Sequence, residues 1–209
     1  RGLTAAQTAA LTTTQIGALT TTQVGALTAT QLGGLTSTQV ASLSTSQIGA
    51  LATTQIAALS TLQVRALETA DLAALTTTQM GGLTSAQLGS LTTIQLGALE
   101  TTDLAVLTTT QLRGLAAAQM AGLTTTQVGA LSTTQLGGLA SSQVAALTTT
   151  QVGVLTTTQV GGLGTTQVRG LTSAQVAGLT TTQVGALTTT QLAALLPAQL
   201  GGMETADLS

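Results

Sequence analysis

The segment LTTTQIGALTTTQVGALTATQLGG, from Leu11 to Gly34, contains three copies of one eight-residue pattern. The same octad begins at Leu3 and returns every eight residues as far as Leu195, without an insertion or a deletion. The chain therefore divides into 25 full octads and a partial one from Met203. A fixed period along a whole chain is typical of a solenoid or a fibre. We expect residues 1–209 to form one continuous array that is a segment of a longer protein.

Each position of the octad has its own residue preference when the leucine is counted as position one. Position two is Thr or Ser in 18 of 26 octads, and position five is Gln in 23 and Asp in the other three. Position six is Val, Ile, Leu or Met except at Thr8, and positions seven and eight are mostly Gly or Ala. Leucine at position one and the apolar residue at position six are therefore the expected core.

A strand and a long helix both fit this pattern poorly, although Thr and Val favour strands. On a strand, positions one and six would point to opposite faces, and each would share its face with polar side chains. On one long helix, an eight-residue repeat drifts by about 80° each time, so the leucines would wind around the axis. A β-solenoid remains the alternative to a solenoid of short helices.

One short helix in every octad agrees with the spacing of the polar residues. Thr at position two and Gln at position five form the S/T-x-x-Q capping box, in which each side chain binds the backbone N–H of the other residue. The single proline, Pro197, then lies at the first helical position, where proline is favoured. The sequence thus predicts an all-α solenoid, a superhelix of very short capped helices with one helix per octad.

Variation among the octads indicates which positions face solvent. Acidic residues occur only at positions two and five, and all four arginines occur at position seven, so these positions are expected to reach solvent. Positions four and eight share a helix face and are expected to form a second contact surface between stacked helices. The acidic segments that begin at Glu68 and Glu100 lie 32 residues apart, a spacing that hints at four octads per superhelical turn.

The composition excludes most kinds of catalytic and binding site. The chain has no His, Cys, Phe, Tyr or Trp, so the usual general bases, thiol nucleophiles and zinc ligands are missing. We expect no enzyme activity and no cofactor, and we assign Met80 and Met120 to the core. A net charge of −2 without a basic patch argues against nucleic-acid binding. Thr and Gln interrupt every apolar run, so no membrane span is expected in this segment.

The six acidic residues are the only candidates for a metal site. They form three E-x-x-D pairs, which are Glu68 with Asp71, Glu100 with Asp103, and Glu204 with Asp207. Carboxylate oxygens are ligands that Ca²⁺ prefers, so a calcium-dependent binding module is one alternative function. The competing interpretation is that these acids sit at helix starts, where the helix dipole favours negative charge. A second alternative is an ice-binding surface made from rows of Thr, which requires the strand model.

The string LTTTQVGALTTTQL at residues 179–192, with its variants LTSAQV and LETADL, resembles octapeptide arrays in very large bacterial surface or secreted proteins. Such proteins are often labelled adhesion or haem-utilisation proteins. The resemblance implies an extracellular or cell-surface stalk or filament. It does not support haem binding here, because no His or Tyr is present to ligate iron. We therefore expect a structural repeat protein that forms a rod, filament or adhesin stalk and associates with itself into a fibre or array.

Overall fold

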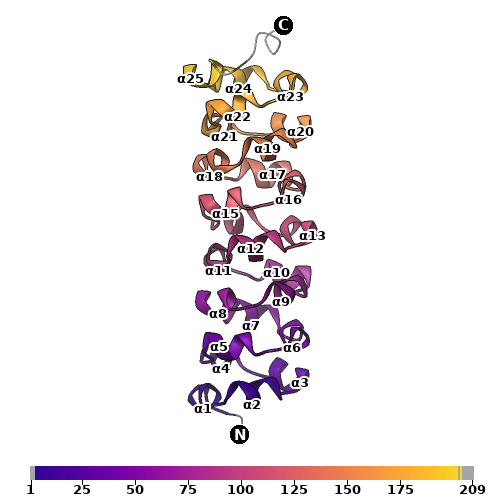
Figure 1. Ribbon diagram of the computed structural model, residues 1–209, viewed down its shortest axis with the longest axis vertical. Helices are drawn as coiled ribbons and strands as arrows, with labels where there is room; N and C mark the ends of the chain where they lie inside the picture. Colours follow the sequence, from indigo (N-terminus) through magenta and orange to yellow (C-terminus); the bar gives the residue numbers. More distant parts are fainter. Residues whose placement is uncertain (1–2, 202, 204–209) are drawn as a thin grey trace. The chain divides into compact units, whose positions relative to one another are not determined.

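The computed structural model describes residues 3–201 and residue 203. The chain falls into two compact units, residues 1–107 and residues 108–209, and each is described by itself. All regular structure in the described residues is helical, with one short helix in each octad (Figure 1). The prediction of an all-α solenoid of short helices is confirmed, and the β-solenoid alternative is wrong. No helix in the described ranges has the length and apolar character needed to span a membrane.

The 25 helices found in the described residues each contain four to six residues. They are α1 (Ala5–Ala9), α2 (Thr13–Gly17), α3 (Thr21–Gly25), α4 (Ala29–Gly33), α5 (Ser37–Ala41), α6 (Thr45–Gly49), α7 (Thr53–Ala58), α8 (Thr61–Arg65), α9 (Thr69–Ala73), α10 (Thr77–Gly81), α11 (Ser85–Ser90), α12 (Thr93–Gly97), α13 (Thr101–Ala105), α14 (Thr109–Leu112), α15 (Ala117–Ala121), α16 (Thr125–Gly129), α17 (Thr133–Gly137), α18 (Ser141–Ala146), α19 (Thr149–Gly153), α20 (Thr157–Gly161), α21 (Thr165–Gly170), α22 (Ser173–Ala177), α23 (Thr181–Gly185), α24 (Thr189–Ala194) and α25 (Pro197–Leu200).

The predicted capping box starts most of these helices. In the octad of α11, the hydroxyl of Thr84 accepts a hydrogen bond of 3.2 Å from the backbone N–H of Gln87. The side-chain oxygen of Gln87 accepts one of 2.7 Å from the backbone N–H of Thr84. Two of the N–H groups that a helix start leaves unpaired are thus satisfied within the octad. Pro197 is the first residue of α25, as its position in the octad predicted.

Most helices have their C-cap residue at position eight, and no helix in the described residues ends in a left-handed residue. In the octad of α12, Ala98 keeps right-handed helical angles (φ −85°, ψ −11°). The N–H of the next leucine, Leu99, then bonds the carbonyl oxygen of Leu96 at 3.2 Å. No described residue has a positive φ, so the glycines at positions seven and eight are not required by backbone conformation.

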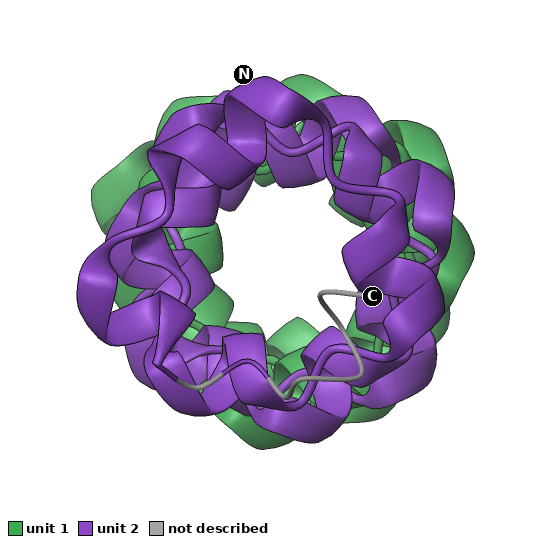
Figure 2. Ribbon diagram, turned by 90° about the horizontal axis from the view of Figure 1, so that it is seen from above, with its two compact units in different colours: residues 1–107 green, residues 108–209 purple. Residues whose placement is uncertain are grey.

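Within each unit the octads wind into a superhelix in which helices pack against helices three places later. In the first unit these pairs include α1 with α4 and α8 with α11, and in the second α18 with α21 and α22 with α25. Figure 2 shows the helices of residues 108–209 arranged in a ring around a common axis. Helix-to-helix packing repeats after three octads, and the glutamine bonds between turns span 28–31 residues, so one turn contains between three and four octads.

Each octad contributes one leucine to the contact below it and one apolar residue to the contact above. Leucines at position one are buried from Leu35 onward but partly exposed from Leu3 to Leu27, where no described turn precedes them. Residues at position six are buried from Ile16 to Val184 but become exposed at Leu192 and Leu200, near the other end. The core therefore lies between successive turns, and the prediction that positions one and six form it is confirmed.

The expected second contact surface is only half correct. Position four is exposed along the chain, and its two largest residues, Leu62 and Ile94, are 71% and 77% exposed. Position eight does make a contact, but with position three of the octad three places earlier. A Cβ atom on Gly82 would lie only 2.2 Å from a methyl carbon of Thr53. Positions three and eight therefore meet between turns, while position four faces solvent.

Candidate functional site

The glutamine at position five is the polar centre of every ordinary octad. Its side-chain oxygen closes the capping box, and its side-chain nitrogen points at the preceding turn. The Nε2 atom of Gln87 donates to the carbonyl oxygens of Leu59 at 2.7 Å and Ile56 at 2.9 Å. One amide thus links its own helix start to the backbone of two earlier octads.

The same bond recurs through both units with nearly constant geometry. The acceptor is the position-one carbonyl oxygen 28 residues earlier, and in the bonds made from Gln39 onward the distance between nitrogen and oxygen is 2.5–2.8 Å. The glutamines that make it are Gln31 (to Leu3), Gln39, Gln47, Gln55, Gln63, Gln79, Gln87 and Gln95 in the first unit, and Gln143, Gln151, Gln159, Gln167, Gln175, Gln183, Gln191 and Gln199 in the second.

From Gln39 onward these side chains are buried, so the expectation that position five reaches solvent is wrong. Gln87 is 2% exposed, whereas Gln7, Gln15 and Gln23, which have no described turn below them, are exposed. The contrast shows that the preceding turn buries the amide. A buried amide without partners is unfavourable, so the bonds to the carbonyl oxygens are what make this burial possible.

Asp71 occupies the same buried position but carries no amide to donate. Its Oδ2 atom accepts a hydrogen bond of 3.1 Å from the backbone N–H of Glu68. Its Oδ1 atom accepts one of 3.0 Å from the hydroxyl of Thr45, three octads earlier. The carboxylate therefore still links two turns, with the direction of the hydrogen bond reversed. The side chain of Glu68 is exposed at the helix start.

Asp103 lies in the equivalent position and has fewer donors. Its Oδ2 atom accepts a hydrogen bond of 3.0 Å from the backbone N–H of Glu100. Within the first unit, no hydroxyl from the preceding turn is bonded to it as Thr45 is to Asp71. Burial raises the pKa of the Asp103 carboxyl, the N–H of Glu100 opposes this, and the nearby Glu100 carboxylate adds to it. The carboxylate form is thus less favourable at Asp103 than in water.

The structure does not gather the acidic residues into one site. In the described ranges, no three carboxylates lie close enough together to hold a metal ion. In each described E-x-x-D pair the aspartate turns to the backbone of its own helix start, while Glu68 and Glu100 are exposed. The third pair, Glu204 with Asp207, lies outside the described residues. Calcium binding therefore stays a prediction, and the geometry of the described acidic residues adds no support to it.

The arginines at position seven lie on the surface, as expected. Arg65, Arg113 and Arg169 are all exposed, while Arg1 lies outside the described residues. In the second unit, the Nε atom of Arg113 donates to the carbonyl oxygen of Gly138, three octads later, at 2.5 Å. This arginine therefore binds the backbone of the next turn.

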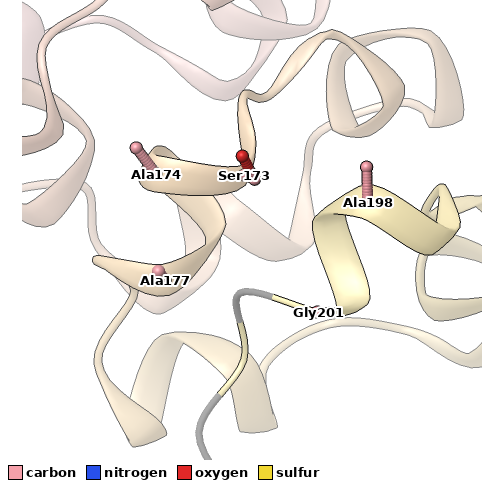
Figure 3. Close-up of a pocket in the computed structure, with 5 residues that line it drawn as sticks. All are labelled: Ser173, Ala174, Ala177, Ala198 and Gly201. Atoms are coloured by element: carbon pink, nitrogen blue, oxygen red, sulfur yellow. The ribbon is translucent and has the colours of Figure 1, made fainter.

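One shallow pocket in the second unit lies between α22 and α25 (Figure 3). It is lined by Ser173, Ala174, Ala177, Ala198 and Gly201. One hydroxyl and four small groups offer neither charge nor a convergent set of donors. The pocket arises because positions four and seven carry only Ala or Gly in both of these stacked octads, and it has no chemistry of a catalytic site.

Known families account for the repeat itself. Five segments of the chain match the family model of the ALTTAQ repeat, at residues 29–61, 64–101, 96–133, 128–165 and 157–189. The chain belongs to the ALTTAQ repeat family. The letters of that description correspond to position eight followed by positions one to five, as in ALTTTQ at residues 18–23. The ALTTAQ motif therefore contains the whole capping box and the amide that joins the turns. None of the curated proteins compared with this chain matches it.

The glutamine contact between turns is the feature that the sequence prediction missed. Position two varies among Thr, Ser, Ala, Gly, Glu and Leu, yet position five is always Gln or Asp. A capping box alone would not require the second residue to be more uniform than the first. This difference is the signal in the sequence that position five has another partner.

Proposed function

We propose that this ALTTAQ-repeat chain is a structural spacer, a rod that forms part of an extracellular filament or of the stalk of a bacterial surface adhesin. The observation that carries the proposal is that the buried polar side chains bind the backbone of the chain itself. The amides at position five, from Gln31 to Gln95 in the first unit and from Gln143 to Gln199 in the second, donate to carbonyl oxygens of earlier octads. The most uniform polar residue of the chain therefore holds turns together and is not presented to a ligand.

The exposed surface supports the same proposal. Positions two and four are exposed in nearly every octad and carry mainly Thr, Ser and Ala. Few charged residues lie on this surface. In the described residues, no nucleophilic side chain lies beside a side chain that could act as its base. A surface of this kind repeats every eight residues and suits a spacer that sets distance.

The octad register continues without interruption from Leu99 through Leu107 to Leu115, across the limit between the two units. We propose that residues 1–209 form one array and that the array is elongated. The location outside the cell rests on the resemblance to large bacterial surface proteins. Self-association into a fibre is part of this proposal.

Sedimentation velocity and small-angle X-ray scattering of the 209-residue chain test the rod. We expect a frictional ratio well above that of a compact protein of the same mass, and a cross-section that does not change with added repeats. A compact particle would contradict the proposal. Antibodies against the repeat should label intact bacteria without permeabilisation, and labelling only after lysis would contradict the surface location.

Calcium provides a separate check on the alternative function. If the chain is a spacer, its thermal unfolding midpoint in calcium should equal that in a chelator. A calcium-dependent midpoint that is lost in the variant Glu68→Gln would favour a binding module instead. The ice-binding alternative required strands, and the described residues contain only helices.

A further inference from the structure

Asp103 occupies the octad position at which glutamine joins the turns. In the preceding octad, the Nε2 atom of Gln95 donates to the position-one carbonyl oxygen of Leu67, 28 residues earlier, at 2.7 Å. The equivalent carbonyl oxygen for Asp103 belongs to Leu75. An ionised carboxylate can only accept hydrogen bonds, so it cannot make this contact. Asp103 is nevertheless buried, with 5% of its surface exposed.

The two oxygens of the Asp103 carboxyl group have different surroundings. The Oδ2 atom closes the helix start by accepting a hydrogen bond of 3.0 Å from the backbone N–H of Glu100. The Oδ1 atom has no hydrogen bond to any described residue. Leu75 is buried, and its carbonyl oxygen receives no hydrogen bond from the described residues. One acceptor on each of two stacked turns therefore lacks a donor, at the place where the other octads supply an amide.

Asp71 shows that an aspartate at this octad position reaches the turn below. Its Oδ1 atom accepts a hydrogen bond of 3.0 Å from the hydroxyl of Thr45, which lies two residues after the position-one leucine of that turn. The residue that corresponds to Thr45 below Asp103 is Thr77, and its hydroxyl makes no hydrogen bond to Asp103. The carboxyl group of Asp71 thus receives a donor from the preceding turn, and that of Asp103 does not.

The groups around Asp103 favour its protonated form. Burial, and to a smaller extent the Glu100 carboxylate, raise the pKa of the Asp103 carboxyl group, and the backbone N–H of Glu100 opposes them. Within the first unit, the described helix that packs against α13 is α10, and it carries no charged residue. In the octad before α10, Glu68 is exposed and Asp71 is bonded to Thr45. No cation from these elements stabilises the Asp103 carboxylate.

We propose that Asp103 binds the preceding turn as a neutral acid, with its Oδ1–H group donating to the carbonyl oxygen of Leu75 in place of the glutamine amide. The step is the gain or loss of one proton at Oδ1. At acid pH the O–H group joins the two turns, and as pH rises the proton leaves for solvent and two acceptors face each other without a donor. The amides of the other octads do not titrate, so Asp103 adds a pH-sensitive joint that the spacer role alone does not require.

Carbon-13 NMR of the labelled 209-residue chain tests the contact directly. The Cγ signal of Asp103 gives the titration midpoint, and the carbonyl signal of Leu75, identified by its absence in Leu75→Met, reports a hydrogen bond to that oxygen. We expect both signals to move with one midpoint, above the usual aspartate pKa of about 3.9. In Asp103→Asn, which cannot titrate, the Leu75 signal should stay constant from pH 3 to pH 7. A Leu75 signal that does not respond to pH in the unmodified chain would overturn the proposal.

The variant Asp103→Gln tests the joint through stability. Glutamine is the residue of 23 of the 26 octads, and it supplies the donor to Leu75 at every pH. We expect Asp103→Gln to raise the thermal midpoint at pH 7 by about 2–4 °C and to flatten its pH dependence between pH 3.5 and pH 7. The matched control Asp71→Gln leaves Asp103 in place, so the pH dependence should persist. A pH dependence that survives Asp103→Gln unchanged would overturn the proposal.

Thr77→Val separates the proton of Asp103 from the other donor within the preceding turn. This variant removes the hydroxyl that corresponds to the partner of Asp71 and keeps a side chain of similar shape. The pH response of the Leu75 carbonyl signal should be the same as in the unmodified chain. Loss of that response in Thr77→Val would show that the hydroxyl, and not the acid of Asp103, joins the turns, and it would overturn the proposal.

Discussion

The side-chain amide of Gln87 donates a hydrogen bond of 2.7 Å to the carbonyl oxygen of Leu59, 28 residues earlier. The same side chain accepts the backbone N–H of Thr84 at the start of its own helix. A single glutamine thus fixes where a helix begins and which turn lies beneath it. The stability of the solenoid should therefore depend on the amide nitrogen separately from the side-chain oxygen.

Gln87→Glu separates these two roles. Glutamate keeps the capping acceptor but removes the donor to Leu59 and buries a charge, so we expect the free energy of unfolding to fall by about 2–4 kcal/mol. Urea unfolding followed by circular dichroism measures the change. The matched variant Gln15→Glu, at an exposed position with only the capping contact, should change stability by less than about 0.5 kcal/mol. Equal effects at the two sites would contradict the role assigned to the amide.

Gly170 should tolerate no larger residue, because it occupies position eight of its octad and lies against the backbone of Ser141. A Cβ atom there would lie 2.8 Å from both the Cα atom and the carbonyl oxygen of Ser141. We expect Gly170→Ala to lower the thermal midpoint and to destabilise the fold by about 1–3 kcal/mol, as overpacking does. Gly185→Ala is the control, since a Cβ atom there meets nothing within 4 Å. That control should be stabilised by about 0.5–1 kcal/mol, because alanine favours helices over glycine.

Gly164 starts α21 without a capping box, although Gln167 still binds the carbonyl oxygen of Leu139. We expect Gly164→Thr to add the missing cap and to stabilise the chain by about a few tenths of a kcal/mol. A Cβ atom at Gly164 would approach only the side-chain end of Gln167, which is flexible. In the octad of α11, the equivalent side-chain oxygen of Gln87 lies beside a threonine and accepts its backbone N–H. Gly164→Ala supplies the Cβ atom without the hydroxyl, and it should not stabilise the chain because alanine is a poorer N-cap residue than glycine. No difference between the two variants in urea unfolding would argue against the cap.

Asp103 should make stability depend on pH. Because burial raises its pKa in the folded chain, the folded state holds this proton more tightly than the unfolded state. The contribution of Asp103 to the free energy of unfolding is therefore largest below the unfolded-state pKa of about 3.9, and it is lost as pH rises through the pKa of the folded state. We expect the difference in thermal midpoint between the unmodified chain and Asp103→Asn to shrink or reverse as pH rises from 3.5 to 7. A difference that is constant over this range would contradict the assignment.

Local structure could be predicted from this sequence because its cause is local. The spacing of Thr84 and Gln87 predicts a helix start, Pro197 predicts the first helical residue, and both lie where expected. The alternation of a leucine at position one with an apolar residue at position six predicts the core. None of these inferences needs knowledge of residues more than one octad away.

The relationship between turns could not be predicted, because it depends on contacts between residues 25–31 positions apart. Asp71 and Asp103 suggested that position five reaches solvent, yet both are buried against an earlier turn. An acid is normally a sign of exposure, but here backbone N–H groups, and for Asp71 the hydroxyl of Thr45, take the place of water. Position four was assigned to a contact because it shares a helix face with position eight. In helices of four to six residues the neighbouring turn covers only one side, and position four lies on the other.

In each octad the preceding turn covers position one, and the following turn covers position six. Because every octad offers the same two contacts, no single octad is essential. Removing residues 83–90, one whole octad, would let each later octad settle on a neighbour that offers the same carbonyl oxygens and the same apolar ridge. Removing four residues instead would leave every subsequent amide facing the wrong backbone groups. The length of such a protein can therefore change in steps of one octad during evolution, by gain or loss of repeats, while its thickness and its internal contacts stay the same.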